Sequence, residues 1–79
     1  RERHTDLTPY GAGASGVSRI HARLSRTGKG ITIEDLGSTN GTLLNGYRLQ
    51  AFTRVPLQDG DALELGHLQF RLRFLDRSL

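Results

Sequence analysis

Apolar and polar residues alternate along several short stretches of this chain. In RIHARLS (19–25) every second residue is apolar, and ITIEDL (31–36) repeats the pattern after the glycine-containing turn RTGKG (26–30). Successive side chains of a strand point to opposite faces, so a period of two predicts strands. We expect a β-hairpin whose first strand has Ile20, Ala22 and Leu24 on one face and His21, Arg23 and Ser25 on the other.

The longest alternation lies near the end of the chain, in HLQFRLRFLD (67–76). The preceding ALELG (62–66) alternates too, and the short connection between them predicts that the two strands pair. No window has helical spacing. Short strands joined by Gly, Asn and Asp turns indicate an all-β sandwich or barrel of mostly antiparallel strands. The last strand is expected to point four side chains at the core: Leu68, Phe70, Leu72 and Phe74.

Composition limits the class of protein. The chain has 79 residues and no cysteine, which predicts one domain without disulfides or thiolate metal sites. The sequence has neither a long apolar run nor the charged-then-apolar start of a signal peptide, so we expect a cytoplasmic protein without a membrane partner. Eleven Lys and Arg against eight Asp and Glu give a net charge of +3. Most of the basic residues are arginine, whose guanidinium suits phosphate and carboxylate groups.

Several chemistries can be set aside. GAGASG (11–16) matches the dinucleotide-binding pattern G-x-G-x-x-G, with Asp35 near the spacing of a ribose-binding acid. That motif requires a helix after it, whereas a period-two stretch follows here, which favours a surface loop. The three histidines lack the spacing of a metal site, and no nucleophile motif is present. We therefore expect no metal, no cofactor and no enzyme activity.

Nucleic-acid binding is the rival that composition leaves open. Arg71 and Arg73 share the predicted outer face of the last strand. Proteins that bind single strands interleave such residues with exposed aromatic side chains, on which bases stack. Phe70 and Phe74 fall on the opposite, core-facing side, so a solvated outer face is favoured and no nucleic-acid partner is expected.

Three segments, taken in order, resemble one known family. GVSRIHARL (16–24), DLGSTNGTLLNG (35–46) and LQDGDALELG (57–66) contain a Ser-Arg-x-His-Ala block, a Ser-Thr-Asn-Gly-Thr block, an Asn-Gly pair and Leu-x-x-Gly-Asp. They resemble the forkhead-associated (FHA) domain over about residues 1 to 75. DLTPYGAGASGVSRIHA (6–22) is particularly similar to bacterial members. The resemblance implies a β-sandwich of two twisted sheets that binds phosphothreonine peptides through loops at one end.

The resemblance also implies which residues bind the phosphopeptide. Ser18 matches the serine that donates to the phosphate, and Arg19 beside it adds charge. Thr39 matches the threonine next to the phosphothreonine, and Asn40 matches the asparagine that holds the peptide backbone. Short hydroxyl donors and a cation suit a phosphothreonine, which carries about −1.5 to −2 charges and three strong acceptor oxygens.

Four further residues match structural positions of the family motif. His21 matches the histidine that shapes the loop and is not itself a ligand. Gly41 and Gly46 are expected to permit positive φ in their turns. Asn45 and Gly46 together predict a tight hairpin turn.

The start of the chain matches the family only in part. The family has a Gly-Arg pair, whose arginine is the main phosphate-binding cation, several residues before an Asp-hydrophobic pair. Asp6-Leu7 is such a pair, and Arg1 stands at the expected distance before it, with Arg3 as the second choice. The family's first strands would then be absent. We expect residues 1–79 to be an N-terminally truncated FHA domain, whose open edge favours a strand-exchanged dimer.

The sequence thus predicts a non-catalytic module that recruits threonine-phosphorylated proteins, the products of a Ser/Thr kinase in a bacterial cytoplasm. Two alternatives stay open. One is an FHA-like structural or assembly domain whose phosphate site is idle, and the other is a basic nucleic-acid-binding β-domain.

Overall fold

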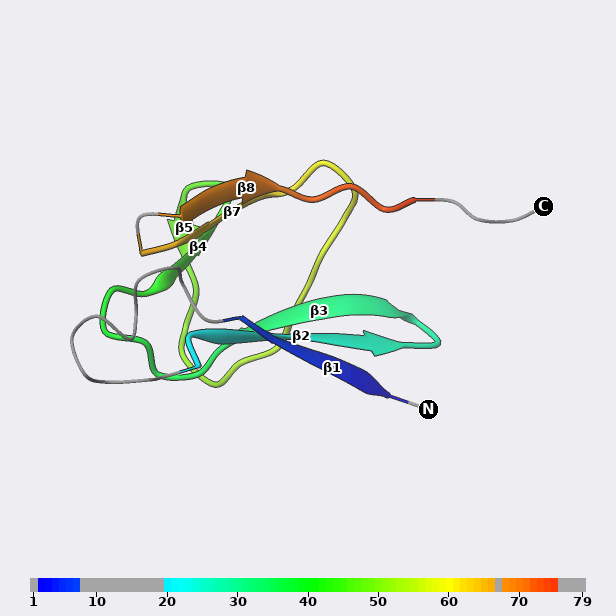
Figure 1. The fold of residues 1–79 in the computed structure, drawn as a ribbon, viewed down its shortest axis with the longest axis horizontal. Helices are drawn as coiled ribbons and strands as arrows, with labels where there is room; N and C mark the ends of the chain where they lie inside the picture. Colours follow the sequence, from blue (N-terminus) through cyan, green and yellow to red (C-terminus); the bar gives the residue numbers. More distant parts are fainter. Residues whose placement is uncertain (1, 8–19, 67, 76–79) are drawn as a thin grey trace.

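The computed structural model describes residues 2–7, 20–66 and 68–75. These residues form two antiparallel sheets that lie as the two layers of a sandwich (Figure 1), which confirms the predicted all-β fold. None of them belongs to a helix long and apolar enough to cross a bilayer. The strands in the described part are β1 (Arg3–Leu7), β2 (Ala22–Thr27), β3 (Gly30–Asp35), β4 (Thr42–Leu44), β5 (Tyr47–Arg48), β6 (Val55–Pro56), β7 (Ala62–Leu65) and β8 (Leu68–Arg71).

The first sheet has the order β1-β2-β3-β6. β2 and β3 form the predicted hairpin, with Ala22 opposite Asp35. Sequence analysis did not predict β1 or β6, because β6 has only two residues and β1 has no alternation of apolar and polar residues. β1 runs antiparallel to β2 and places Leu7 opposite Ala22. The end of β1, the start of β2 and the end of β3 therefore lie side by side at one end of the sheet.

The second sheet has the order β5-β4-β7-β8. Asn45 and Gly46 connect β4 to β5 with φ angles of +52° and +87°. Positive φ at both positions is the geometry of the tight turn that fits the twist of a hairpin, as the sequence predicted. The carboxamide of Asn45 also donates to Asp61 at 3.0 Å and accepts from the N–H of Ala62 at 2.9 Å, which ties the turn to the start of β7.

The core lies between the two sheets and draws on both. Its partly buried rim includes Leu24, Leu44 and Val55. Most of the core residues occupy the inward positions of an alternating strand, so one side of each sheet removes apolar surface from water. The most buried apolar side chains come from β2, β3, the segment after β6, and β7: Ala22, Ile33, Leu57, Leu63 and Leu65.

The last strand is shorter and less buried than its alternation predicted. β8 ends at Arg71, and three of the four side chains expected in the core are 38–39% exposed: Leu68, Phe70 and Phe74. That expectation is wrong for these three, while Leu72 packs against the core. Among the strands that the structure describes, β8 lies at the edge of its sheet and pairs with β7 alone. Beyond Arg71 the chain leaves the sheet and bonds to the turn at 59–61.

Two side chains on the face that the alternation at 19–25 marked as polar are buried, one in β2 and one just before it. Ser25 is 1% exposed and His21 is 6% exposed. His4 of β1 covers Ser25, with its Nδ1 atom 2.8 Å from the Ser25 hydroxyl. Ile20, on the apolar face of the pattern, is instead 39% exposed, because the strand begins only at Ala22. The burial of Ser25 thus depends on β1, a separate segment that the alternation at 19–25 does not include.

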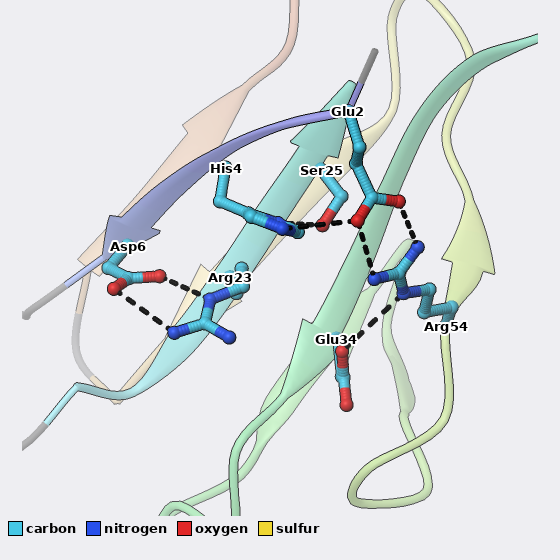
Figure 2. A network of polar contacts seen from close by, with 7 residues as sticks. All are labelled: Glu2, His4, Asp6, Arg23, Ser25, Glu34 and Arg54. Carbon is cyan, nitrogen blue, oxygen red and sulfur yellow. Dashed lines mark hydrogen bonds and ion pairs between the residues drawn. The ribbon is translucent and has the colours of Figure 1, made fainter. Parts of the chain in front are cut away.

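Charged side chains cover the outer face of the first sheet (Figure 2). Arg23 on β2 donates to both carboxylate oxygens of Asp6 on β1, at 2.5 and 3.3 Å. Arg54 pairs with Glu2, and its Nε atom lies 3.8 Å from Glu34 on β3. The pKa of Asp6 is lowered chiefly by the hydrogen bond from Arg23, and that of Glu2 chiefly by the hydrogen bond from Arg54. Exposed ion pairs contribute little stability. We therefore infer that these pairs serve mainly to position β1 beside the rest of the sheet.

The hairpin turn provides a test of backbone strain at Gly46. Its φ is +87°, and no atom lies within 4 Å of the place where a β-carbon would stand. Gly46→Ala should therefore lower the free energy of unfolding by about 1 kcal/mol through strain alone. Gly28→Ala is the matched control, because position 28 is equally open but has no left-handed φ. It should change stability by less than about 0.5 kcal/mol in urea unfolding, and equal losses in both variants would contradict the turn assignment.

Candidate functional site

Residues 36–41, here called the 36–41 loop, connect the two sheets at one end of the molecule. The loop follows β3 and precedes β4, and it is the green segment on the left of Figure 1. Backbone hydrogen bonds bring distant segments to it. The N–H of His21 donates to Leu7 at 2.8 Å, and the N–H of Phe52 donates to Asp35 at 2.7 Å. The N–H of Leu36 donates to His21 at 3.0 Å, so the segments around His21 and Phe52 both meet the chain at the start of this loop, and the end of β1 is joined to it through His21.

The 36–41 loop folds around the carboxylate of Asp35, the residue that immediately precedes it. Asp35 is 3% exposed. Its Oδ1 atom accepts hydrogen bonds from the hydroxyls of Ser38 at 2.5 Å and Thr42 at 2.7 Å. Its Oδ2 atom accepts from the N–H groups of Gly37 at 3.1 Å and Ser38 at 3.2 Å. A buried carboxylate is tolerated only with such partners, so the loop folds around this charge.

The hydrogen bonds keep Asp35 ionised. Burial alone would raise the pKa of Asp35, because it disfavours the charged form. The hydroxyls of Ser38 and Thr42, together with the two N–H groups, outweigh burial and hold the pKa below the ordinary value of 3.8. At neutral pH the donors of the loop therefore point at a fixed negative charge.

His21 holds the other end of the loop. The Nε2 atom of its buried ring lies 2.7 Å from the carbonyl oxygen of Gly41. A carbonyl oxygen can only accept, so Nε2 is the donor in this contact. The same atom lies 3.9 Å from Oδ1 of Asp35, too far for a hydrogen bond. The ring thus shapes the loop from inside and does not face solvent.

The segment 48–52 lies against two glycines of the loop. A β-carbon at Gly37 would lie 2.9 Å from Cζ of the Phe52 ring, and one at Gly41 would lie 2.7 Å from Nε of Arg48. Both glycines also have left-handed φ angles, +76° and +82°. Any larger residue would therefore strain the backbone and displace a neighbour. Phe52 itself has a φ of +61°, which is rare for a bulky side chain.

Thr39 and Asn40 stand at the tip of the loop. Both are exposed, whereas Gly41 and Thr42, which follow them, are buried. The loop thus presents one hydroxyl and one carboxamide to solvent from a backbone that is held at both ends. Each group can donate and accept hydrogen bonds, so the pair suits a ligand with anionic oxygens and an exposed peptide backbone.

The structure brings together only some of the residues that the resemblance implied. His21, Thr39, Asn40 and Gly41 meet at the 36–41 loop. Asn45 and Gly46 lie beyond the other end of β4, where they form the hairpin turn. Three residues implied for phosphopeptide binding lie outside the described residues: Arg1, Ser18 and Arg19.

Arg3, the second choice for the upstream cation, lies away from the loop. It begins β1 opposite Arg26, whereas the end of β1 at Leu7 is the part that approaches the loop. Across residues 2–7, 20–66 and 68–75, no group of three His, Asp or Glu side chains could hold a metal ion.

Sequence reasoning missed three residues that build the site. Asp35 was weighed only as a ribose-binding acid. A signal for its role was present, because an Asp whose carboxylate accepts from N–H groups two and three residues later is typical of a turn. Arg48 and Phe52 had no local signal, since both reach the loop through tertiary packing.

The family model of the FHA domain matches residues 1–66. The chain belongs to the FHA family. This FHA domain is 46% identical over 52 residues to the FHA domain-containing protein At4g14490 of Arabidopsis thaliana, and 43% identical over 57 residues to the FHA domain-containing protein FhaB of Mycobacterium tuberculosis. These matches cover 66% and 72% of this chain, but only 14% and 36% of the two relatives.

A solved structure agrees with the fold. The solution structure of the FHA domain of an Arabidopsis thaliana hypothetical protein matches with a TM-score of 0.58 and 37% sequence identity, over 80% of this chain and 57% of that chain. FHA domains bind phosphorylated proteins. The chain is therefore, in this general sense, a phosphoprotein-interaction module.

The buried carboxylate predicts a specific pH dependence of stability. Asp35→Asn should lower the free energy of unfolding at pH 7 by about 1–3 kcal/mol, because the loop loses charge-assisted hydrogen bonds. A folded-state pKa lowered from 3.8 means that the wild-type advantage is complete above about pH 5 and declines as the pH falls through the folded-state pKa.

Urea unfolding between pH 2.5 and 7 measures this difference for wild type and Asp35→Asn. Glu64→Gln is the control, since among the described residues its carboxylate accepts a single long hydrogen bond, from Gln69 at 3.4 Å. A difference between wild type and Asp35→Asn that does not change with pH would contradict the assigned role of the carboxylate.

Proposed function

We propose that this FHA domain binds phosphothreonine in extended peptides and so recruits threonine-phosphorylated proteins. The observation that carries the proposal is the anchored 36–41 loop. Its backbone is tied at Asp35 and Gly41, while Thr39 and Asn40 are exposed at its tip. In this assignment the domain binds a modified protein and does no chemistry on it.

A loop that is fixed before binding favours recognition of a peptide. A ligand that must order a flexible loop loses part of its interaction energy to that ordering, whereas a preformed loop avoids most of this cost. All four hydrogen bonds to the Asp35 carboxylate come from donors of the domain itself, Gly37, Ser38 and Thr42. Thr39 and Asn40 are therefore presented in one arrangement, which supports a binding role for the exposed tip.

The proposal assigns the phosphate to hydroxyl and guanidinium donors. Thr39 and Ser18 supply hydroxyls, Arg1 and Arg19 supply positive charge, and Asn40 holds the peptide backbone. These groups match the charge and the acceptor oxygens of a phosphothreonine. Ser18 precedes His21 by three residues, which limits their separation to about 11 Å. Because the ring of His21 touches the loop, this spacing supports a shared site.

The proposed partners follow from the ligand. They are proteins phosphorylated on threonine by a Ser/Thr kinase, and the proposed setting is the cytoplasm, where such kinases act. The chain spans only a fraction of its curated relatives, so the module is proposed to work as the recognition part of a larger signalling protein.

Matched peptides test the proposal directly. Calorimetry with peptides that differ only in carrying Thr, phosphoserine or phosphothreonine should give at least about tenfold tighter binding for phosphothreonine than for Thr, from charge-assisted hydrogen bonds. Binding of Thr and phosphothreonine peptides alike, or of neither, would contradict it and favour an assembly domain with an idle site. Tight, strongly salt-dependent binding of oligonucleotides instead would favour the nucleic-acid alternative.

Variants then locate the site. Ser18→Ala and Arg1→Ala should each weaken binding of the phosphothreonine peptide by about tenfold or more, and Asn40→Ala by about fivefold, because each removes hydrogen bonds to the ligand. Gln69→Ala removes the same kind of side chain as Asn40→Ala from β8, away from the loop, and should bind as wild type. Thermal unfolding confirms that each variant is folded. Equal affinity of the folded Ser18, Arg1 and Asn40 variants and wild type would contradict the assigned site.

A further inference from the structure

We propose that Arg48 selects among phosphopeptides, favouring those with an acidic side chain close to the phosphothreonine. The inference rests on the proposed function, because it concerns the ligand of the same loop. Arg48 plays no part in the motif that identified the family resemblance, and its place at the loop emerges only from the folded structure.

The first argument is the position of the guanidinium group. Arg48 lies on β5 opposite Leu43, at the edge of the second sheet. Its Nε, Cζ and Nη2 atoms would lie 2.7, 2.9 and 3.2 Å from a β-carbon at position 41. Because Gly41 has no β-carbon, the guanidinium rests directly on the loop backbone, next in the chain to Asn40. A peptide held by Asn40 therefore passes close to this positive charge.

The second argument is the charge itself. Arg48 is exposed, and within the described part of the chain no carboxylate lies within 4.0 Å of it. Arg23 and Arg54 on the outer face of the first sheet are different, since both are paired with acids. Among the described residues, the guanidinium of Arg48 thus keeps exposed donors that a ligand can use.

The third argument is the chemistry that fits this group. A guanidinium presents a flat fork of N–H donors that matches the two oxygens of a carboxylate. Asp or Glu in the peptide satisfies it, while Lys or Arg at the same place meets like charge. The chain's net charge of +3 acts in the same direction and favours acidic ligands in general. An acidic residue near the phosphothreonine is therefore the partner that the geometry selects.

A scan of peptide pairs tests this assignment. Each pair carries phosphothreonine and differs only by Glu or Gln at one position, from three residues before to three residues after it. Wild type should bind the Glu member about fivefold more tightly at one or two adjacent positions, the upper range of an exposed ion pair. Raising the salt concentration should reduce that ratio, because salt screens exposed charges.

Three variants assign the preference to a residue. Arg48→Gln should reduce the Glu-to-Gln ratio to about one, with a larger loss of affinity for the Glu peptide than for the Gln peptide. Arg48→Lys should keep part of the ratio, because the charge remains. Arg26→Gln is the matched control: it removes the same charge from an exposed position near the other end of β2, and it should keep the wild-type ratio.

Other outcomes would overturn the inference. A wild type without any Glu preference would do so, as would a preference that persists in Arg48→Gln. Equal weakening of every phosphopeptide in Arg48→Gln would assign Arg48 to the phosphate itself and not to a neighbouring acid. These results leave the discrimination between Thr and phosphothreonine intact. Loss of that discrimination in wild type would instead refute the proposed function, and this inference with it.

Discussion

One buried negative charge organises the end of the molecule where the candidate site lies. The carboxylate of Asp35 accepts four hydrogen bonds from residues within seven positions of it, so the chain has to turn tightly after β3. Without the charge, the two N–H groups and two hydroxyls around it would lose their strongest acceptor. The donors keep the pKa of Asp35 low although burial opposes ionisation. The shape of the loop and the charge state of its centre therefore depend on each other.

The neighbouring contacts extend this constraint to the rest of the fold. His21 links the loop to the start of β2, and the backbone of Phe52 links it to the segment before β6. Both sheets thus reach the same loop, which lies between β3 and β4 where the chain crosses from one layer to the other. These buried contacts fix the position of the exposed tip at Thr39 and Asn40. The position of the proposed binding tip consequently depends on contacts from the whole end of the sandwich.

Much of the fold could be predicted because its strands carry a local signal. The alternation at 31–36 and 62–66 gave correct core positions such as Ile33, Leu63 and Leu65. The Asn45-Gly46 turn was also predictable, because few residue pairs tolerate positive φ. The alternation at 67–76 misled because periodicity shows which side chains share a face, whereas the neighbouring sheet decides whether that face is covered. Ser25 and His21 are buried for the same non-local reason.

The site was predictable to the extent that its residues are consecutive. Thr39, Asn40 and Gly41 stand together in the motif, so a family resemblance locates them without a structure. The groups that hold or flank them are different. Arg48 and Phe52 contact the loop only because β5 pairs with β4 and because the chain after β5 lies beside Asp35. No spacing in the sequence records those contacts, and only coordinates could supply them.

Amide hydrogen exchange at Gly37 and Ser38 tests the central claim most directly, because both N–H groups donate to the Asp35 carboxylate. If the 36–41 loop is preformed around this charge, the two amides exchange slowly in the ligand-free domain, and a bound phosphothreonine peptide changes their rates little. In Asp35→Asn the same amides should exchange faster. Exchange at the rate of an unstructured peptide in the free domain, with protection only when the phosphopeptide is bound, would contradict the account.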